Sequence, residues 1–397
     1  MDCFVLNPAA LISTGDEGYV AYVVGTRLLH RLNATAALIL ELSDGSRDIK
    51  QIADLLGSVL PESTIRDWVE SAERDGLLVS SDCSPKPYSA TQLSELANEL
   101  RGQGRIFPAF LCQKQAAEVA PDDAEIWNQL GQLAHILGRR VEARDAYERY
   151  FRWFPDDAEV AHLLISLRDE TPPSRASDRC IEQLYAQFAS YYNENMVGEL
   201  DYQAPDRVAE ALAVTLEYRT GLDILDLGCG TGLSGQRLKP WARRLVGIDL
   251  SPHMVERAQT LGIYDMLETA EITAWLAAGE SKFDVIVACD CMIYFGDLAQ
   301  VMVPAARRLH PEGVLVFTVE RGQSAPFRLT DSGRYTHHSD HIGQVAIKAG
   351  FTLIRCDEVF LRVEYGEDVH GLLAVMKWDS RDSETESDIS RNSLRPV

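Results

Sequence analysis

One segment near the middle of the chain constrains the fold more than any other. Residues 222–227 form an apolar run that carries Asp226 and leads directly into Gly228-Cys-Gly-Thr-Gly232. A buried parallel strand, a tight glycine turn and a helix start follow one another in this way at a nucleotide-binding crevice. Glycine suits the turn because the backbone reverses sharply and a ligand must approach it without a Cβ in the way.

A second acidic residue follows at the place where such a crevice needs one. Asp249 ends the next apolar run, residues 244–248. A carboxylate at the end of that strand can bind both hydroxyls of a ribose. Asp226 stands just before the loop, and its negative charge would repel the pyrophosphate of a dinucleotide. The pattern therefore favours a cationic ligand with an amino-acid end over NAD.

These residues resemble the first motif of the class I S-adenosylmethionine (SAM)-dependent methyltransferases, an acid followed by G-x-G-x-G. The resemblance covers about residues 181–377 and implies a Rossmann-like α/β fold with a doubly wound sheet. Residues 283–290 would be its fourth strand, and residues 309–319 would hold the turn and the fifth strand. The alternative, that the glycines only turn a corner in a doubly wound fold, leaves the two acids at strand ends unexplained.

The resemblance also implies the cofactor, SAM, and how it is held. Asp226 and the glycine loop would hold the methionine part, Asp249 the ribose, and Glu271 the adenine amino group. Cys229 is expected to fill space rather than to act as a nucleophile, since nothing nearby in the sequence would lower its pKa. The full set expected at the cofactor is Asp226, Gly228, Cys229, Gly230, Gly232, Asp249, Leu250, Met254, Glu271, Ile272, Asp290, Tyr191 and Tyr202.

The segments on either side of these motifs predict the acceptor end of the site. Residues 184–193 and 200–205 resemble the lid of such methyltransferases, and Phe188, Tyr191, Tyr192 and Tyr202 would be aromatic walls for a sulfonium cation, although core packing is an equal alternative. Residues 320–338 form a turn-rich loop that carries Arg321, Arg328, Arg334, His337 and His338. Such a basic loop favours an anionic acceptor, and solvated charges are its plain alternative.

Methyl transfer is an in-line displacement, so a base is needed only when the attacking atom must lose a proton. A carboxylate needs none. His337 or Asp290 would serve as the base for an amine or a hydroxyl. The predicted catalytic residues are Asp290, His337, Tyr294, Arg334 and Arg321.

Composition limits the remaining possibilities. At 397 residues the chain exceeds the roughly 250–300 at which single cores stop growing, so two or three domains are expected. Its formal net charge of −22 argues against a nucleic-acid partner and leaves a neutral or basic peptide open, although the charge could also serve only solubility. The eight cysteines lack metal-site spacing. No bound metal is therefore expected. The sequence shows neither a secretory signal nor a membrane-length apolar run, so the protein is expected to be cytoplasmic.

Upstream of the methyltransferase motifs, the sequence contains a repeat of 34 residues. Pro-Asp-Asp-Ala-Glu begins at Pro121 and again at Pro155, and this spacing is the length of a tetratricopeptide (TPR) unit. Residues 88–172 are therefore predicted to form antiparallel helix pairs, with partial units at about 94–119 and 158–167. So short a run favours a spacer or a dimer surface, and the second of these would make the protein a homodimer. Peptide binding is the alternative. Together with the methyltransferase motifs, the layout resembles a bacterial group of predicted TPR-containing methyltransferases.

Residues 1–85 are predicted to be a small winged-helix module. Three short strands, at 10–13, 19–24 and 28–32, precede helices at 34–41, 47–56 and 62–75. The third helix is too acidic to enter a DNA groove. At residues 32–45 the segment resembles the PqqD-like peptide recognition elements.

That resemblance implies a partner, the leader of a ribosomally made precursor peptide. The leader would add a strand beside residues 28–32 and place apolar side chains against residues 65–72, where Ile65, Trp68, Val69 and Ala72 form one stripe, although core packing is the alternative for that stripe.

The whole chain is thus interpreted as four parts. They are a leader-recognition winged helix (1–85), a TPR-like helical segment (88–172), a SAM-dependent methyltransferase (178–378) and a disordered tail (379–397). The expected function is methylation of a ribosomal peptide, with a carboxylate oxygen as the expected acceptor. A small-metabolite methyltransferase and a non-catalytic TPR scaffold are the alternatives.

Overall fold

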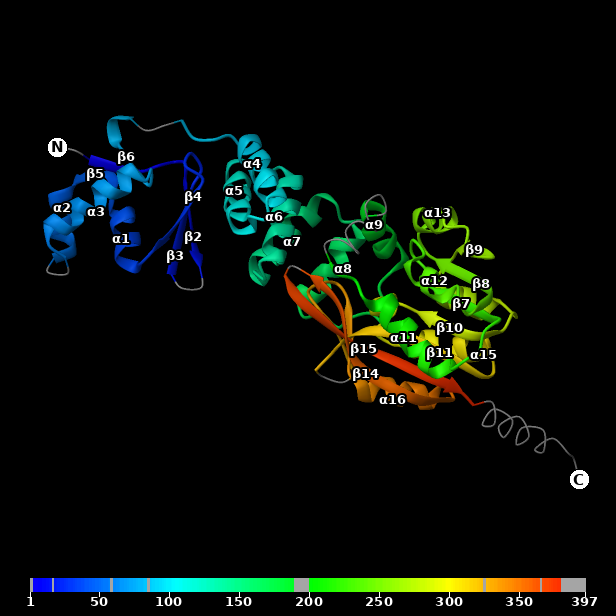
Figure 1. Ribbon diagram of the computed structural model, residues 1–397. Coiled ribbons are helices and arrows are strands. Elements are labelled where there is room, and N and C mark those ends of the chain that lie inside the picture. The colour runs from blue at the N-terminus through cyan, green and yellow to red at the C-terminus, as the bar shows by residue number, and fades with distance from the viewer. Residues whose placement is uncertain are drawn as a thin grey trace, which may run out of the picture. The chain divides into compact units, whose positions relative to one another are not determined.

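The computed structural model describes residues 3–15, 18–57, 60–83, 86–188, 200–323, 326–364 and 366–379 (Figure 1). The chain divides into two compact units, residues 1–154 and 155–397. Each unit has a hydrophobic core of its own. Tyr191, Tyr192 and nearly all of the predicted tail lie outside the described residues. Within the described ranges, no helix is both long enough and apolar enough to span a bilayer.

Two small antiparallel sheets open the N-terminal unit. One has the order β2-β3-β4, with β2 (Ala10–Gly15), β3 (Gly18–Val23) and β4 (Leu28–Leu32), which confirms the three predicted strands. The other has the order β5-β1-β6, with β5 (Asp44–Asp48), β1 (Cys3–Leu6) and β6 (Leu78–Ser80). The second sheet was not predicted, because a strand such as Asp-Gly-Ser-Arg-Asp shows no alternation of apolar and polar residues.

Three helices pack against these sheets. They are α1 (Ala34–Leu42), α2 (Ile49–Leu56) and α3 (Glu62–Arg74), as predicted to within a few residues. Asn33 caps α1, and Asp48 forms a capping box with Gln51 at the start of α2. The apolar stripe of α3 lies inside the core: Ile65 and Val69 are fully buried and Ala72 is 2% exposed. Only Trp68 of the stripe is partly exposed, so the other three residues cannot form a surface for a peptide.

Two antiparallel helix pairs complete the N-terminal unit. They are α4 (Ala90–Gly102) with α5 (Ile106–Val119), and α6 (Ala124–Ile136) with α7 (Arg140–Trp153). A Cβ at Gly131 would lie 2.6 Å from the ring of Tyr147, so glycine allows the close crossing of α6 and α7. Asp123 and Asp157, one repeat apart, cap α6 and α8 (Ala158–Leu167) with their side chains.

The boundary between the units lies inside the predicted segment 88–172, because its last helix belongs to the second unit. His162 of α8 is hydrogen bonded to the carbonyl oxygen of Gly333 at 3.0 Å, and the Ser166 hydroxyl donates to Asp331 at 2.9 Å. The next helix, α9 (Asp178–Phe188), also contacts α8, and its Gln183 accepts from the first backbone N–H groups of that helix.

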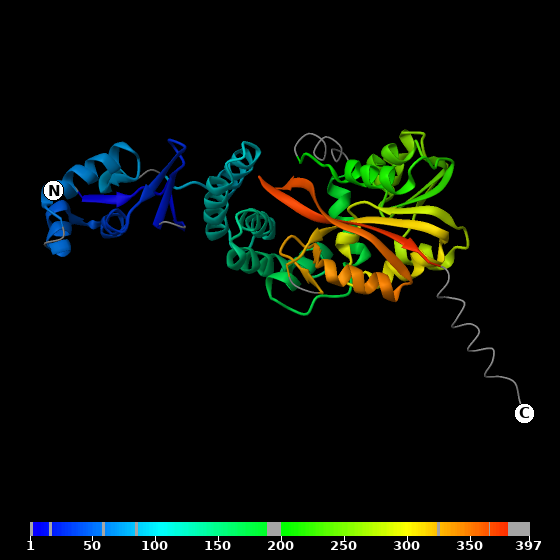
Figure 2. The same cartoon turned by 60° about the horizontal axis from the view of Figure 1, so that its bottom comes forward.

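A single twisted sheet forms the centre of the second unit. Its main path is β14-β15-β11-β10-β7-β8-β9, and all neighbours are parallel except at β15, which is antiparallel to both of its partners (Figure 2). The strands are β7 (Leu222–Leu227), β8 (Ala242–Asp249), β9 (Met266–Thr269), β10 (Phe283–Ala288), β11 (Leu309–Arg321), β14 (Phe351–Glu364) and β15 (Glu367–Trp378). The predicted first, fourth and fifth strands are thereby confirmed.

Helices cover both faces of this sheet because its strands are apolar on both sides. Ile224 packs in one core with α11 (Ala204–Leu216) and α12 (Leu233–Leu238). Its neighbour Leu225 packs in the other, with α14 (Ile272–Ala278), α15 (Ala299–Arg307) and α16 (Ser339–Lys348). This arrangement is the predicted doubly wound α/β fold.

Three short elements of the second unit lie near the carboxyl ends of the strands. Helix α13 (Pro252–Thr260) follows β8, and the 3-10 turn η4 (Met292–Tyr294) follows β10. The hairpin β12 (Phe327–Leu329) and β13 (Tyr335–His337) pairs with the last residues of β11. The chain crosses from one side of β7 to the other at β10, and ligands bind in such sheets outside the strand ends at that switch point.

Candidate active site

The glycine loop follows the fully buried strand β7 and has the backbone that the sequence requires. Gly228, Gly230 and Gly232 all have positive φ, at 65°, 54° and 93°. A Cβ at Gly228 would clash with the Cβ of Cys291, and one at Gly232 would lie 2.6 Å from Leu261. Glycine is therefore needed both for the turn and for the close approach of neighbouring side chains.

Asp249 lies at the end of β8 and faces the loop. One carboxylate oxygen accepts the backbone N–H of Gly230 at 2.9 Å, and the other accepts that of Ser251 at 2.8 Å. Burial raises the pKa of this carboxyl group, and the two backbone donors oppose that shift. Each oxygen keeps a lone pair, so Asp249 can still accept two hydroxyl groups of a ligand.

Glu271 starts α14 as its N-cap. Its side chain accepts from the backbone N–H groups of Thr273 and Ala274, at 3.0 and 2.7 Å. The guanidinium group of Arg175 lies 3.9 Å from the same carboxylate. These contacts fix the carboxylate at the end of the strand row next to β9.

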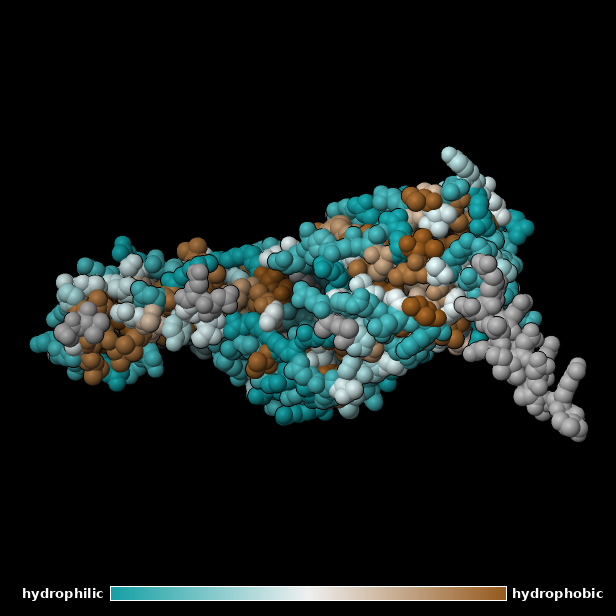
Figure 3. Space-filling model, turned by 90° about the horizontal axis from the view of Figure 1, so that it is seen from below, coloured by the Kyte–Doolittle hydropathy of each residue, from teal (hydrophilic) through white to brown (hydrophobic). Residues whose placement is uncertain are grey.

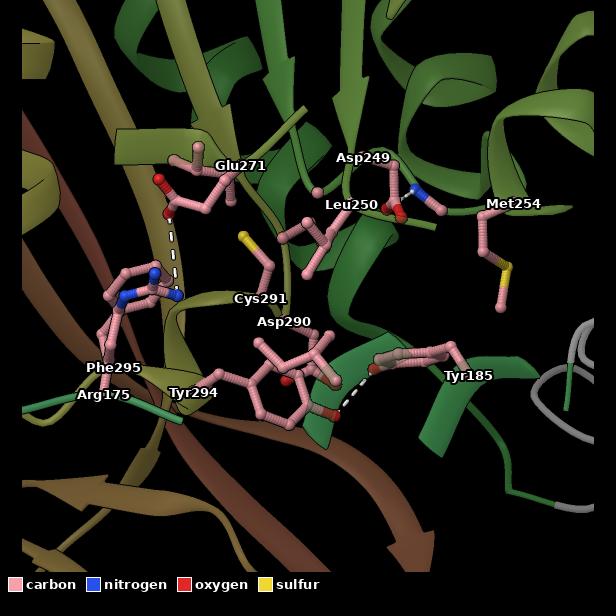
Figure 4. Close-up of a pocket in the computed structure, with 15 residues that line it drawn as sticks. Arg175, Tyr185, Asp249, Leu250, Met254, Glu271, Asp290, Cys291, Tyr294 and Phe295 are labelled. Atoms are coloured by element: carbon pink, nitrogen blue, oxygen red, sulfur yellow. Dashed lines mark hydrogen bonds and ion pairs between the residues drawn. The ribbon is translucent and has the colours of Figure 1, made fainter. Parts of the chain in front are cut away.

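These side chains surround a cavity at the carboxyl ends of β7, β8 and β10 (Figure 4). In Figure 4, Asp249 and Met254 lie on one side of the space, Glu271 and Arg175 on the other, and Tyr185 and Tyr294 below it. The lining consists of Arg175, Ile181, Tyr185, Gly228, Gly230, Asp249, Leu250, Met254, Glu271, Ile272, Cys289, Asp290, Cys291, Tyr294 and Phe295.

The structure brings together most of the residues expected at the cofactor. Those that line the cavity are Gly228, Gly230, Asp249, Leu250, Met254, Glu271, Ile272 and Asp290. Cys229 and Gly232 belong to the glycine loop but are not among the lining residues, and the Tyr202 hydroxyl group lies 3.6 Å from the Cys289 sulfur. Tyr191 lies outside the described residues.

Asp226 differs from expectation because its carboxylate does not reach the cavity. It is fully buried and accepts the hydroxyl groups of Ser234 and Tyr264 at 2.8 and 2.7 Å. Burial raises its pKa to about 6. Asp226 therefore supports the glycine loop from behind, and the methionine end of a cofactor would meet other groups.

The sequence motifs did not identify six of the lining residues: Arg175, Ile181, Tyr185, Cys289, Cys291 and Phe295. Arg175 reaches the site because its segment runs beside η4, where the Ala176 N–H donates to the Tyr294 carbonyl oxygen at 2.8 Å. Cys289 and Cys291 flank Asp290 and could have been inferred from it. For Arg175, no pattern in the neighbouring sequence indicated a place at the site.

The segment that forms this site matches a known protein family. Residues 225–317, which run from β7 to β11 and include the glycine loop, Asp249, Glu271 and Asp290, match the family described as "Methyltransferase domain". The second unit contains a SAM-dependent methyltransferase domain.

Curated relatives of the methyltransferase domain have related names. The chain is 31% identical over 126 residues to malonyl-[acyl-carrier protein] O-methyltransferase of Acetivibrio thermocellus, covering 30% of this chain and 44% of that protein. It is 26% identical over 219 residues to ubiquinone biosynthesis O-methyltransferase of Xanthomonas oryzae, covering 49% and 88%. The chain thus spans less than half the length of the first of these relatives.

The chain was also found similar to a solved structure. Magnesium protoporphyrin IX methyltransferase from Synechocystis PCC 6803 with bound SAM is 20% identical, with a TM-score of 0.36, and the match covers 45% of this chain and 79% of that one.

SAM is the cofactor of the methyltransferase domain, and the residues present fit it. Gly228 and Gly230 leave the floor of the cavity without Cβ atoms, and Asp249 has free lone pairs toward it. Glu271 lies one strand farther along, next to β9. The described residues thus provide hydrogen-bond acceptors for the ribose and the adenine amino group, in the order expected from the sequence.

A tyrosine pair closes one side of the cavity of the methyltransferase domain. The hydroxyl groups of Tyr185 on α9 and Tyr294 on η4 are 2.8 Å apart, and their rings meet edge to face at 6.0 Å. Tyr294 was predicted to reach the cleft, and it lines the cavity. Burial raises its pKa. The Tyr294 hydroxyl group is therefore neutral and can hydrogen bond to an acceptor without adding charge.

The basic loop of the methyltransferase domain does not take the expected position. Arg321 is about half exposed and binds Glu358 at 2.8 Å, while Arg334 binds Glu364 at 2.5 Å. His337 is fully buried, and its Nε2 is hydrogen bonded to the Phe295 carbonyl oxygen at 2.8 Å. None of the five basic residues of this loop, Arg321, Arg328, Arg334, His337 and His338, is among the residues that line the cavity.

The reason is that β12 and β13 fold back as a hairpin onto β11 and α8. Burial lowers the pKa of His337 to about 4, so the ring is neutral near pH 7. A neutral, fully buried histidine can neither attract an anionic acceptor nor reach its proton. Of the five predicted catalytic residues, only Asp290 and Tyr294 line the cavity.

Asp290 follows β10 and is held in an unusual position. Its φ is +56°, in the left-handed region that non-glycine residues rarely adopt. Its backbone N–H donates to the Thr318 hydroxyl group at 2.8 Å, and its Oδ2 accepts from Arg362 of β14 at 3.1 Å. Its Oδ1 is buried and has no hydrogen-bond partner. An oxygen in this state beside a ligand cavity indicates a ligand contact.

Proposed function

We propose that the chain is a SAM-dependent O-methyltransferase whose acceptor is carried by a peptide that the N-terminal unit recruits. The observation that carries the enzymatic part is the cavity at the switch point of the sheet, where the glycine loop, Asp249 and Glu271 converge. The names of the curated relatives, which are O-methyltransferases, support oxygen as the acceptor atom. SAM supplies a methyl group on a positively charged sulfur.

The acceptor oxygen is proposed to be a hydroxyl group rather than the carboxylate expected from the sequence. Three of the lining residues carry a carboxylate, namely Asp249, Glu271 and Asp290, whereas among them only Arg175 carries a guanidinium group. Arg175 is itself engaged, since it binds Asp178 at 2.5 Å. An anionic acceptor would meet this negative surface without the Arg contacts predicted for it.

A hydroxyl acceptor also needs a place for its proton, and the unpartnered Oδ1 of Asp290 offers one. In the proposed reaction the acceptor oxygen forms a bond to the methyl carbon, and the electron pair of the carbon–sulfur bond stays on sulfur. The hydroxyl proton passes to Asp290. The hydroxyl groups of Tyr185 and Tyr294 lie on the same side of the cavity and would orient the acceptor.

The peptide part of the proposal rests on the N-terminal unit. Strand β4 is at the edge of its sheet and pairs with β3 alone among the described strands. Leu28 and Leu29 of β4 are 53% and 44% exposed, and Tyr19 on β3 is 41% exposed. Apolar surface is visible on this unit at the left of Figure 3. An extended peptide could add as a strand to this edge and cover these side chains.

A second candidate is methylation of a small metabolite or a carrier-bound acid, with the N-terminal unit used for assembly. The names of relatives that act on malonyl-[acyl-carrier protein] and in ubiquinone biosynthesis favour it. The two candidates differ in whether β4 matters for substrate use.

The test combines binding and transfer on the full chain. Calorimetry should show binding of SAM and none of NAD; the reverse would contradict the enzymatic proposal. Methyl-labelled SAM is then incubated with short peptides encoded beside the gene, and the product is analysed by mass spectrometry after mild base. An ether survives base and an ester does not. Loss of transfer in Leu29→Asp, with SAM binding unchanged, would support recruitment at β4, whereas unchanged transfer would favour the metabolite candidate.

A further inference from the structure

Asp290 belongs to a buried cluster of charged side chains that extends away from the cavity. Arg362 contacts Asp290 and Glu320 and also Glu364, the last at 3.0 Å. Arg334 contacts Glu364 at 2.5 Å and Glu320 at 3.6 Å. Glu320 belongs to β11 and Arg362 and Glu364 to β14, whereas Asp290 follows β10 and Arg334 directly precedes β13. The five side chains are between 3% and 22% exposed. We call these five residues the charge cluster.

The charge cluster is not balanced. Three carboxylates face two guanidinium groups, so it carries one excess negative charge. The two arginines hold the pKa of Glu364 below its usual range despite its burial, so this member is ionised. A buried negative charge without a partner is unfavourable by several kcal/mol, and proteins therefore pair such charges.

The three carboxylates of the charge cluster are not paired equally. The carboxylates of Glu320 and Glu364 are held by both arginines. Asp290 contacts Arg362 through Oδ2 alone. Its Oδ1 is buried and has no hydrogen-bond partner, and Asp290 is one of the residues that line the cavity. The positive φ of Asp290 and the Thr318 contact fix the residue at the strand end. The cluster thus presents its unpaired negative charge to the cavity.

The strand order tells which part of a ligand lies there. Glu271 and Asp249 stand beyond β9 and β8, and the glycine loop follows β7. Asp290 follows β10, the next strand in that row. A nucleoside whose adenine and ribose lie at Glu271 and Asp249 would extend across the glycine loop and bring its far end to Asp290. In SAM the positively charged sulfur follows the ribose in that direction, and the ammonium and carboxylate groups of the methionine part lie beyond it.

We infer that the charge cluster is completed by the sulfonium group of SAM, with Asp290 as the contact and Arg362 as the residue that positions it. This inference rests on the proposed function, since it assumes that SAM occupies the cavity. It assigns a role to four residues outside the cavity, Glu320, Arg334, Arg362 and Glu364. It also predicts that the protein distinguishes SAM from its neutral-sulfur product, S-adenosylhomocysteine (SAH).

The experiment measures the affinities of the full-length chain for SAM and for SAH by calorimetry. Asp290→Asn keeps the shape of the side chain and removes its charge. We expect SAM affinity to fall by about tenfold or more, the effect of losing a charged contact, and SAH affinity to change by less than about threefold. Sinefungin, which has a charged amine in place of the methylsulfonium, should behave like SAM.

Glu271→Gln is the matched control, because it alters a carboxylate at the adenine end that SAM and SAH share. It should weaken both ligands by the same factor. Glu364→Gln removes the excess charge without touching the cavity, and it should lower the preference for SAM by a smaller factor than Asp290→Asn. Circular dichroism and thermal unfolding of each variant identify any that do not fold.

SAM binding by the wild type tests the proposed function, and the Asp290→Asn variant tests the charge cluster. If the wild type does not bind SAM, the proposed function is wrong. If the wild type binds SAM but Asp290→Asn weakens SAM and SAH equally, or weakens neither, the charge cluster does not contact the sulfonium and only this inference is overturned. An equal loss for both ligands in Asp290→Asn would place the ammonium group, which they share, at this carboxylate instead.

Discussion

The two ends of the cavity are built on different principles. At the glycine loop, polar side chains accept backbone N–H groups and keep lone pairs for a ligand: Asp249 accepts from Ser251, 2 residues away, and from Gly230, 19 residues away. At the other end, where Asp290 and the charge cluster lie beside the β12–β13 hairpin, charged side chains contact one another across strands. We call this the hairpin end; in it Arg362 contacts Asp290, 72 residues earlier in the sequence. Contacts of the first kind join residues of one motif or of two successive motifs. The second kind depends on which strands meet.

The largest expected effect tests the hairpin end. Arg362→Met would leave Asp290, Glu320 and Glu364 buried with only Arg334 to pair them, and the free energy of unfolding should fall by about 3–5 kcal/mol. The matched control is Arg355→Met, on the same strand, which removes an exposed pair with Asp357 and should change stability by less than about 1 kcal/mol. Urea denaturation measures both. Similar losses in the two variants would contradict the view that burial makes the charge cluster different.

The two ends should also respond to pH in opposite directions. Burial lowers the pKa of His337 from 6.5 to about 4, so its contribution to stability is present above pH 6.5 and is lost as the pH falls toward 4. Burial raises the pKa of Asp226 from 3.8 to about 6, so its contribution is present below pH 3.8 and is lost as the pH rises toward 6. Each contribution amounts to ~3 kcal/mol.

Urea denaturation between pH 4 and 7 can separate these contributions. His337→Gln should reduce the loss of stability on acidification, and Asp226→Asn should increase it. Identical pH dependence in both variants and the wild type would mean that neither group titrates differently in the folded and unfolded states.

At the glycine-loop end, the expected effect is on binding rather than folding. Asp249→Ala removes the carboxylate that faces the ribose position and should weaken SAM by about 1.5–3 kcal/mol. Calorimetry with SAM and SAH measures it, and both ligands should lose the same amount because both contain the ribose. Tighter or unchanged binding would show that Asp249 serves only to hold the loop through Gly230 and Ser251.

The same contrast explains what the sequence could predict. The strands, the glycine turn and Asp249 follow from apolar runs and strand-end rules, which are local. Arg175 could not be found, because its place beside Phe295 depends on pairing between segments 120 residues apart. Arg334 and His337 were misplaced for a related reason: in sequence they are basic residues of a loop, but in the fold their partners, Glu364 and the Phe295 carbonyl oxygen, come from other elements.

The smallest expected effect concerns Arg321, which the sequence places with Arg334 on the same loop. Its guanidinium group binds Glu358 at the surface, and both side chains are nearly half exposed. Arg321→Leu should therefore change the free energy of unfolding by less than about 1 kcal/mol and leave SAM affinity unchanged. If the acceptor were an anion held by this loop, the same variant would lower methyl transfer by orders of magnitude, which the transfer assay with methyl-labelled SAM detects. Because Arg321 is outside the cavity, we expect transfer to persist, and that result would exclude Arg321 from recognition of the acceptor.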